Sequence, residues 1–395
     1  MLAFTFPGQG SQKPAMGEAW QDHPSWDLVA RASEASGRDV AALLLQADAD
    51  ELKLTHNAQL STFVLSMVVF DAVRRRGIGA SHVAGHSLGE YSALVAAGVI
   101  DFGTGCRLVA ERGAAMREAS LQQVGTMAAV LGLDDPLVEE ACAEVRAGGG
   151  EVWLANANAP GQAVIAGAPE ALELAGAAAK ARGAKRVMPV AVTGAFHTPY
   201  MATAQTRLDA ALASVRFADA VVPVAANTDA ALHRAAGDWP GLLSQQLCSP
   251  VRWRELLGVL SADGVSVLVE LGPGNVLTGM AKRTVEDART FSAATPQEVD
   301  RLVTELAALA PDETPPTDGE HLTASERLVV SPAAGVFSPV ADLRDGHRVE
   351  VGDVIGRVGE HEVRSRFTGW LMGLLAHHGE RVTSRQPIAW LRTAP

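Results

Sequence analysis

The chain has 395 residues, 48% of them hydrophobic, which is enough for two or three domains with large buried cores. Its formal net charge of −12 argues against a nucleic-acid-binding protein, because binding to phosphates requires basic patches. No apolar run approaches the roughly 20 residues of a membrane-spanning helix, so we expect no membrane partner. The N-terminus lacks the features of a signal peptide. With three scattered cysteines that lack metal-ligand spacing, the sequence predicts a reduced, cytoplasmic protein without a metal site.

The first part of the chain alternates short strands with helical patterns. Residues 2–6 have the pattern of a buried strand that ends at Pro7, and helical patterns fill much of residues 14–80. Residues 81–85 form a second predicted strand, followed by a helix that ends near Gly98. This alternation predicts an α/β domain with a mainly parallel sheet.

Residues from about 120 to 190 change in character. Strand-like segments alternate with alanine-rich helical runs at 136–147 and 168–182, in the order β-α-β-β-α-β. This order predicts a small ferredoxin-like insert. The α/β pattern then resumes and continues to about residue 310, so the first domain is predicted over residues 1–310.

A segment rich in proline and acidic residues follows at 311–322 and is predicted to be a linker. Residues 323–395 contain an internal repeat, which predicts a quasi-symmetric, all-β sandwich. The repeated positions are Ser331, Gly335, Gly346, Val349 and Ile355, which recur as Ser365, Gly369, Gly379, Val382 and Ile388.

The strand at 81–85 leads into the sequence GHSLG, a G-x-S-x-G pattern around Ser87. Between a strand and a helix, this pattern predicts a nucleophilic serine on a sharp turn. The backbone N–H of Leu88 would open the helix, where an amide can stabilise an oxyanion. The alternative is a glycine-rich turn that holds an incidental serine.

A second glycine-rich loop, FPGQGSQ at residues 6–12, follows the first strand. It matches neither nucleotide-binding pattern, G-x-G-x-x-G or G-x-x-x-x-G-K-[ST]. A loop of this kind could supply a second backbone N–H to an oxyanion.

His197, in the sequence GAFHTPYM, is the candidate general base. A serine hydroxyl is a weak nucleophile until a neighbouring imidazole takes its proton. An isolated histidine is more often structural, so His197 needs support from elsewhere in the chain.

Arg112 shares a helical stripe with apolar residues at three- and four-residue spacing, including Leu108 and Met116. A buried arginine needs an anionic partner, and its planar fork suits a carboxylate. Periodicity alone leaves two alternatives, an internal salt bridge and a bound carboxylate.

Together, these segments resemble the malonyl-CoA:acyl carrier protein transacylase family over residues 1 to about 310. The resemblance rests on several motifs in the family's order: FPGQGSQ, GHSLGEYSALVAAG, VAERGAAM, NANAPGQAVIAG, GAFHTPYM, QQLCSPVRW and VELGPGNVLTGMAKR. It implies a hydrolase-like, parallel-sheet acyltransferase domain that moves a malonyl group from malonyl-CoA to an acyl carrier protein in fatty acid biosynthesis. No covalently bound cofactor is implied.

The resemblance also assigns roles to individual residues. Ser87 would be the nucleophile and His197 its base, and the Arg112 guanidinium would clamp the malonyl carboxylate. The remaining roles are the oxyanion-hole amides of Gln9 and Leu88, a backbone carbonyl of Gln246 that orients His197, and pocket-lining side chains of Gln59 and Asn158.

Two further positions bear on the substrate. Leu88 and Phe196 resemble malonyl-using members rather than methylmalonyl-using relatives. Leu60 stands where a proline commonly follows the pocket glutamine, a departure that bears on the pocket wall beside Gln59.

The C-terminal segment resembles the biotinyl/lipoyl-like hammerhead, in which a lysine at a hairpin tip carries the cofactor. Here the expected tip is Gly359-Glu360-His361, and no lysine follows Lys282. An amide-linked biotin or lipoate therefore has no attachment point. The segment is predicted to dock a synthase component instead.

Three alternatives compete with malonyl transfer for fatty acid synthesis. An α/β-hydrolase would show an acidic triad member and a late histidine, whereas His197 lies mid-chain. An acyltransferase that supplies a polyketide synthase carrier would use the same chemistry. A non-catalytic scaffold would be expected to lose Ser87, Arg112 or His197, and all three are present.

Overall fold

The computed structural model describes residues 1–309, 321–323, 326–341 and 343–393. The chain divides into two compact units, Met1–Ala307 and Ala308–Pro395. Residues 311–320 of the predicted linker lie outside the described residues, and strand β11 (His321–Thr323) begins at the end of that segment. In the described part of the chain, no helix is both long and apolar enough to cross a bilayer.

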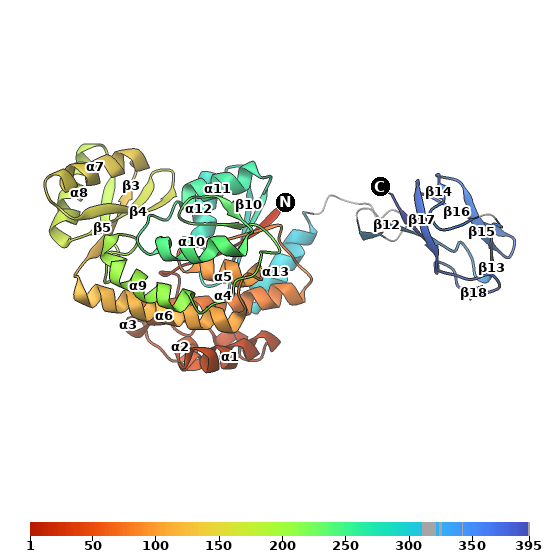
Figure 1. The fold of residues 1–395 in the computed structure, drawn as a ribbon, viewed down its shortest axis with the longest axis horizontal. Coiled ribbons are helices and arrows are strands. Elements are labelled where there is room, and N and C mark those ends of the chain that lie inside the picture. The colour runs from red at the N-terminus through yellow and green to blue at the C-terminus, as the bar shows by residue number, and fades with distance from the viewer. Residues whose placement is uncertain (310–320, 324–325, 342, 394–395) are drawn as a thin grey trace. The chain divides into compact units, whose positions relative to one another are not determined.

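The first unit is an α/β structure (Figure 1). Its helices are α1 (Asp27–Ser36), α2 (Val40–Leu45), α3 (Ala49–Lys53), α4 (Thr55–Arg75), α5 (Gly89–Ala96), α6 (Phe102–Gln122), α7 (Asp135–Ala147), α8 (Pro169–Ala181), α9 (Ala202–Leu212), α10 (Trp239–Gln246), α11 (Trp253–Ala262), α12 (Val276–Thr284) and α13 (Pro296–Ala307). Its strands are β1 (Leu2–Phe6), β2 (His82–Gly85), β3 (Thr126–Leu131), β4 (Val152–Ala159), β5 (Gln162–Gly167), β6 (Arg186–Pro189), β7 (Val224–Ala225), β8 (Leu232–His233), β9 (Val267–Leu271) and β10 (Arg289–Ala293).

The larger sheet of this unit has six strands in the order β10-β9-β1-β2-β7-β8. All neighbouring strands are parallel except β8, which pairs antiparallel with β7. The prediction of a mainly parallel sheet is therefore confirmed. Loops at the carboxyl ends of β1, β2 and β7 meet at one edge, where α/β proteins bind their ligands.

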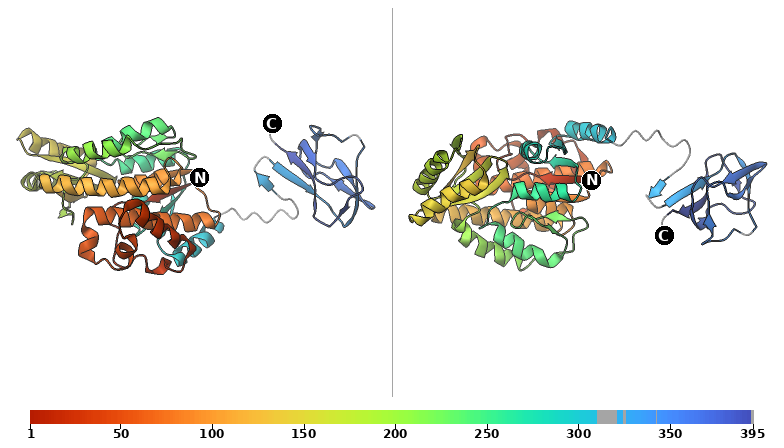
Figure 2. Two further views of the ribbon diagram at one scale, coloured as in Figure 1. Left: turned by 60° about the horizontal axis from the view of Figure 1, so that its bottom comes forward. Right: turned by 90° about the horizontal axis from the view of Figure 1, so that it is seen from above.

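The two faces of this sheet are buried by different helices. Phe4 and Phe6 of β1 point into the core that contains α4, α5 and α6. Ala3, Ala84 and Ala225 point to the opposite face and pack with α11 and α12. Alternation of large and small residues along β1 thus fits the two-residue period of a strand. In Figure 2, helices lie on both sides of this sheet.

A smaller sheet is formed by β3 to β6 in the order β4-β5-β3-β6, with antiparallel neighbours. The element order along the chain is β3-α7-β4-β5-α8-β6, the order expected from the sequence. Helices α7 and α8 pack on this sheet around a separate core. Strand β4 also contacts the larger part of the unit, because Ala157 N donates to Val251 O over 2.9 Å.

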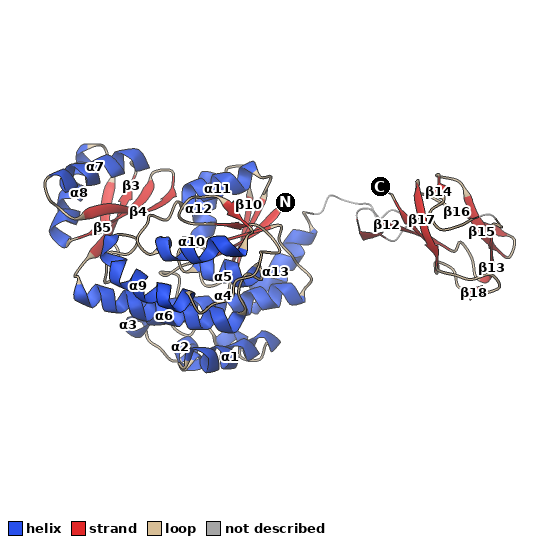
Figure 3. Cartoon of the chain, viewed as in Figure 1, coloured by secondary structure: helices blue, strands red, loops and turns tan. Residues whose placement is uncertain are grey.

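In the second unit, the described elements are strands and loops (Figure 3). One sheet has the order β11-β12-β19-β17-β14 and the other β16-β15-β13-β18, with a shared apolar core. The strands after β11 are β12 (Glu326–Val330), β13 (Gly335–Pro339), β14 (Arg348–Val349), β15 (Val354–Val358), β16 (His361–Arg364), β17 (Gly369–Leu374), β18 (Arg381–Val382) and β19 (Pro387–Arg392).

The sequence repeat is visible in the strand pairing of this unit. Val349 of β14 pairs with Gly369 of β17, and the equivalent Val382 of β18 pairs with Gly335 of β13. Each half of the repeat therefore contributes a short strand to the sheet of the other half. The buried serine that begins each half makes an equivalent bond: Ser331 Oγ donates to Ala333 O, and Ser365 Oγ to Phe367 O.

The hairpin between the two halves is one residue tighter than the sequence suggests. His361 pairs with Val358, so it belongs to β16 rather than to the tip. The tip is the two-residue turn Gly359-Glu360, and Gly359 adopts a φ of +59°. Two-residue hairpins require left-handed residues of this kind, which glycine adopts without strain.

Candidate active site

The turn between β2 and α5 holds Ser87, whose φ is +52°. A Cβ on Gly85 would lie 1.9 Å from the carbonyl carbon of Gly89, and a Cβ on Gly89 would lie 2.0 Å from Phe6 O. Both glycines of the G-x-S-x-G pattern are thus required because neighbouring backbone atoms lie too close to leave room for a Cβ. The pattern forces the turn that exposes the serine.

The backbone of Ser87 is held from two sides. Asn227, after β7, accepts a hydrogen bond from Ser87 N at 2.6 Å, and its Nδ2 donates to Gly85 O at 2.7 Å. Gln246, at the end of α10, donates from Nε2 to Ser87 O at 2.9 Å. A left-handed conformation at a serine costs about 1–3 kcal/mol, so it persists only where the surroundings fix it.

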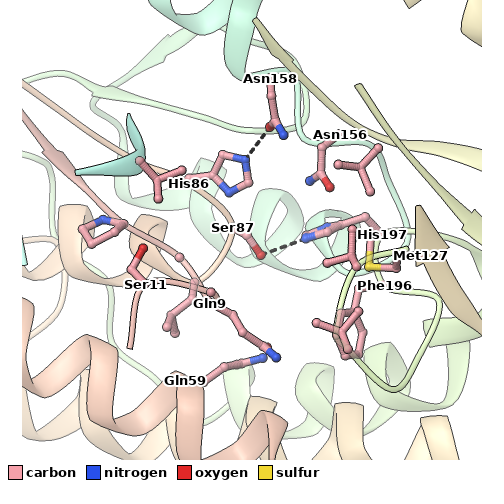
Figure 4. Close-up of a pocket in the computed structure, with 18 of the residues that line it drawn as sticks. Gln9, Ser11, Gln59, His86, Ser87, Met127, Asn156, Asn158, Phe196 and His197 are labelled. Carbon is pink, nitrogen blue, oxygen red and sulfur yellow. Dashed lines mark hydrogen bonds between the residues drawn. The ribbon is translucent and has the colours of Figure 1, made fainter. Parts of the chain in front are cut away.

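His197 faces the serine hydroxyl. Its Nε2 lies 2.8 Å from Ser87 Oγ, as Figure 4 shows, and its Nδ1 lies 2.8 Å from the carbonyl oxygen of Gln246. A carbonyl can only accept, so the proton is on Nδ1 and the lone pair of Nε2 faces the hydroxyl. Burial, assisted by the charge of Arg112, lowers the pKa of His197 to about 3, so the ring is neutral at physiological pH.

Arg112, on α6, is fully buried and reaches the same hydroxyl. Its Nη2 donates to Ser87 Oγ at 3.1 Å and to Gln246 Oε1 at 2.8 Å, and its Nη1 donates to Gln59 Oε1 at 2.7 Å. All three acceptors are neutral groups. The Glu90 carboxylate attracts Arg112 only across the Gln246 amide, without a direct hydrogen bond. Burying a charge without a directly paired counter-charge is costly, so this guanidinium is prepared for an anionic ligand beside the serine.

These groups open into one cavity of about 210 Å³ between the two sheets of the first unit. Gln9 and Leu88 both line it, and Leu88 is the N-cap of α5, where the first backbone N–H groups lack partners inside the helix. The loop that carries Gln9 lies directly on the serine turn, because a Cβ on Gly8 would be 2.6 Å from His86 O. Both expected oxyanion donors therefore belong to the cavity wall.

The two expected pocket residues also line the cavity. Gln59 accepts from Arg112, and its Nε2 lies 3.1 Å from the sulfur of Met116. Asn158 Oδ1 lies 2.8 Å from His86 Nε2 (Figure 4). Leu60 is buried in the core and is absent from the cavity lining, so the departure at this position leaves the described pocket wall unaffected.

Three parts of the site escaped the sequence reasoning: Asn227, the buried Glu90, and the side chain of Gln246. Asn227 follows β7 at the sheet edge where Ser87 lies, so its position after a strand was the available signal. Glu90 is the one charged residue of the helix GEYSALVA, which also signals a specific partner. No sequence signal gave the side-chain contacts of Gln246.

Comparison with known proteins agrees with this geometry. The family model "Acyl transferase domain" matches residues 3–312. The chain belongs to this family. Among relatives, the malonyl CoA-acyl carrier protein transacylase of Escherichia coli K12 is 44% identical over 295 residues, 74% of this chain and 95% of the relative. The Bacillus subtilis 168 protein of that name is 39% identical over 307 residues, 77% and 97% of the two chains.

Solved acyltransferase structures are similar as well. An acyl-carrier-protein S-malonyltransferase of Burkholderia pseudomallei has a TM-score of 0.73 at 39% identity and covers 77% of this chain and 99% of that chain. A malonyl-transacylase in complex with a type II polyketide synthase acyl-carrier protein has a TM-score of 0.74 at 39% identity, with the same coverage. The α/β acyltransferase fold of the first unit is thereby confirmed.

Proposed function

We propose that this acyltransferase is an [acyl-carrier-protein] S-malonyltransferase. It moves a malonyl group from malonyl-CoA to the phosphopantetheine thiol of an acyl carrier protein through a malonyl ester of Ser87. The observation that carries the proposal is the buried Arg112 guanidinium, 3.1 Å from the hydroxyl that would attack. The relatives at 39–44% identity, all named transacylases of this kind, support it.

In the first half-reaction, Ser87 Oγ attacks the thioester carbonyl while its proton passes to His197 Nε2. Gln246 O stabilises the imidazolium that forms, because it accepts from Nδ1. The N–H groups of Gln9 and Leu88 would receive the oxyanion, and each such donor contributes about 3 kcal/mol in comparable sites. The C–S bond then breaks, and CoA leaves with the proton from Nε2.

In the second half-reaction, the carrier thiol gives its proton to His197 Nε2 and attacks the ester. The C–O bond to Ser87 breaks, and the serine recovers its proton. The ester must be kept from water between the two steps, and the cavity of about 210 Å³ with apolar side chains such as Met127 and Phe196 in its wall would help to exclude water.

The carboxylate of the substrate also acts on the base. The charge of Arg112 is one cause of the low pKa of His197. A malonyl carboxylate paired with Arg112 would neutralise this charge and raise the pKa of the imidazole. Acetyl-CoA has no such carboxylate, so it leaves the base weaker.

Product analysis separates transfer from hydrolysis. We expect the enzyme, incubated with malonyl-CoA and a holo-carrier protein, to yield malonyl-carrier protein faster than free malonate. Malonate as the dominant product, at saturating carrier, would make the protein a hydrolase. If the folded protein forms neither malonyl-carrier protein nor malonate, the protein is a non-catalytic scaffold.

We propose fatty acid biosynthesis as the pathway, which the resemblance to the transacylase family implies, and the cytoplasm as the location, which the sequence predicts. The curated relatives are named malonyl CoA-acyl carrier protein transacylases, which fits this pathway. The polyketide alternative has its own support, because a similar solved structure holds a type II polyketide synthase carrier protein. The rates of malonyl transfer to a fatty acid synthase carrier protein and to a polyketide synthase carrier protein decide between the two pathways.

For the second unit we propose a biotinyl/lipoyl-like sandwich that docks a synthase component and carries no cofactor. The two sheets, the exchanged short strands and the Gly359-Glu360 hairpin support the fold assignment. The absence of lysine after Lys282 in the sequence supports a non-carrier role. Deletion of residues 322–395 should raise the KM for the carrier protein. An unchanged KM would refute the docking role.

A further inference from the structure

Glu90 is a buried carboxylate beside the active site, and the proposed reaction gives this carboxylate no role. It lies three residues after Ser87 on α5, is 1% exposed, and is absent from the cavity lining. Its Oε1 accepts from Asn227 N at 2.7 Å, and its Oε2 accepts from Gln246 Nε2 at 2.6 Å. Glu90 therefore contacts both residues that hold the Ser87 backbone, without reaching the substrate cavity.

The amide of Gln246 has one orientation that satisfies all its neighbours. Its Nε2 faces two acceptors, Glu90 Oε2 and Ser87 O, whereas its Oε1 faces the donor Nη2 of Arg112. A flipped amide would set N–H against N–H at Arg112, and oxygen against oxygen at the other two partners. Since unsatisfied buried groups are costly, the carboxylate of Glu90 and the cation of Arg112 together fix the amide.

We propose that Glu90 is a positioning residue for malonyl selectivity: its carboxylate fixes the Gln246 amide, and the amide aims the Arg112 guanidinium at the Ser87 hydroxyl. This inference rests on the proposed function, in which Arg112 binds the malonyl carboxylate. An acetyl group makes no demand on Arg112, so loss of Glu90 affects malonyl loading more than acetyl loading.

Protonation of Glu90 has the same effect as its removal. Each carboxylate oxygen faces an N–H donor, so a proton on either oxygen replaces a hydrogen bond with a clash of two donors. Burial raises the pKa of Glu90 to about 7; Arg112 on α6 opposes this shift, and Asp229 after β7 adds to it. Tyr91, the next residue on α5, stays a neutral phenol because burial raises its pKa. Selectivity for malonyl therefore falls as the pH falls through about 7.

The test compares the rates at which malonyl-CoA and acetyl-CoA load Ser87. Intact-protein mass spectrometry measures both rates. In Glu90→Gln the amide can satisfy only one of the two donors. We expect the malonyl-to-acetyl ratio to fall about tenfold, the loss typical of one charge-assisted hydrogen bond. Equal loss of both rates would overturn the inference and make Glu90 a structural residue.

A double-mutant cycle shows whether Glu90 acts through Arg112. In an Arg112→Ala background, Glu90→Gln should change the ratio no further, because there is no guanidinium left to aim. The same tenfold fall in that background would overturn the inference. Glu270→Gln is the matched control: Glu270 is also 1% exposed, but accepts from Leu277 N and Thr278 N. It should lower the Tm and leave the ratio unchanged.

The wild-type enzyme provides a test that does not depend on the folding of a variant. Between about pH 8.5 and about pH 5.5, the malonyl-to-acetyl ratio should fall along one titration centred near 7. A flat ratio over this range would overturn the inference. If wild-type Ser87 takes no acyl group from any acyl-CoA, the proposed function fails instead, so the two failures are distinguishable.

Discussion

Replacing Arg112 with alanine should convert a malonyl-selective enzyme into one that prefers acetyl groups. The guanidinium is fully buried and donates to Gln59, Ser87 and Gln246, so a malonyl carboxylate would meet it in a site without bulk water. Truncating one member of a buried, hydrogen-bonded charge pair costs about 2–5 kcal/mol. A mid-range loss of about 3 kcal/mol, at 1.4 kcal/mol per tenfold, lowers malonyl loading by about 10²-fold.

Acetyl loading should be spared or improved in the same variant. The methyl group of acetyl-CoA gains nothing from Arg112, and the charge of Arg112 lowers the pKa of His197. The assay is single-turnover loading of Ser87 from each acyl-CoA, with Arg112→Lys as the control. Lysine keeps the charge but lacks the planar fork, so malonyl loading of Arg112→Lys should lie between that of the wild type and that of Arg112→Ala. Equal losses for both substrates would refute the reasoning and make Arg112 structural.

Four further predictions concern His197, Gly89 and the second unit. Burial lowers the pKa of His197 from 6.5 to about 3, so acetyl loading should stay flat from about pH 8 to about pH 4; a loss centred near 6.5 would contradict this. The imidazole of His197 protonates near pH 6.5 in the unfolded chain and near pH 3 in the folded protein. His197 should therefore reduce the free energy of unfolding progressively as the pH falls below 6.5. Urea titrations of the wild type and of His197→Ala measure this effect, which the variant should lack. Gly89→Ala would place Cβ 2.0 Å from Phe6 O, so we expect a loss of stability of about 2 kcal/mol or more and no loading, and an unchanged Tm would contradict the close approach. Deleting residues 322–395 should leave malonyl loading unchanged, since residues 1–307 form a compact unit that contains Ser87, His197 and Arg112; a matching collapse of loading would make the second unit part of the catalytic fold.

Local patterns predicted the α/β fold of the first unit and the sharp turn that holds Ser87, because both depend on short-range geometry. Alternating strands and helices fix a parallel sheet, and the two glycines around Ser87 are dictated by contacts within the turn and with β1. The Arg112 stripe indicated burial, and Arg112 is indeed fully buried. Periodicity could not show which group the guanidinium meets.

The polar network behind the serine was not predictable in the same way. Asn227 and Gln246 lie 140 and 159 residues from Ser87 in the sequence, and each makes its contact through a side chain whose direction depends on the assembled fold. The resemblance to the transacylase family implied the backbone carbonyl of Gln246 as partner of His197, but the amide that joins Glu90 to Arg112 required the three-dimensional structure. The turn at Gly359-Glu360 likewise depends on strand register, which a sequence repeat leaves open by one residue.

The central claim is that Ser87 carries the malonyl group between two thiols. Intact-protein mass spectrometry after mixing the full chain with malonyl-CoA measures this directly. We predict one malonyl adduct on the wild-type protein, none on Ser87→Ala, and loss of the adduct when a holo-carrier protein is added. An adduct that persists in Ser87→Ala, or a folded wild-type protein that forms none, would contradict the account.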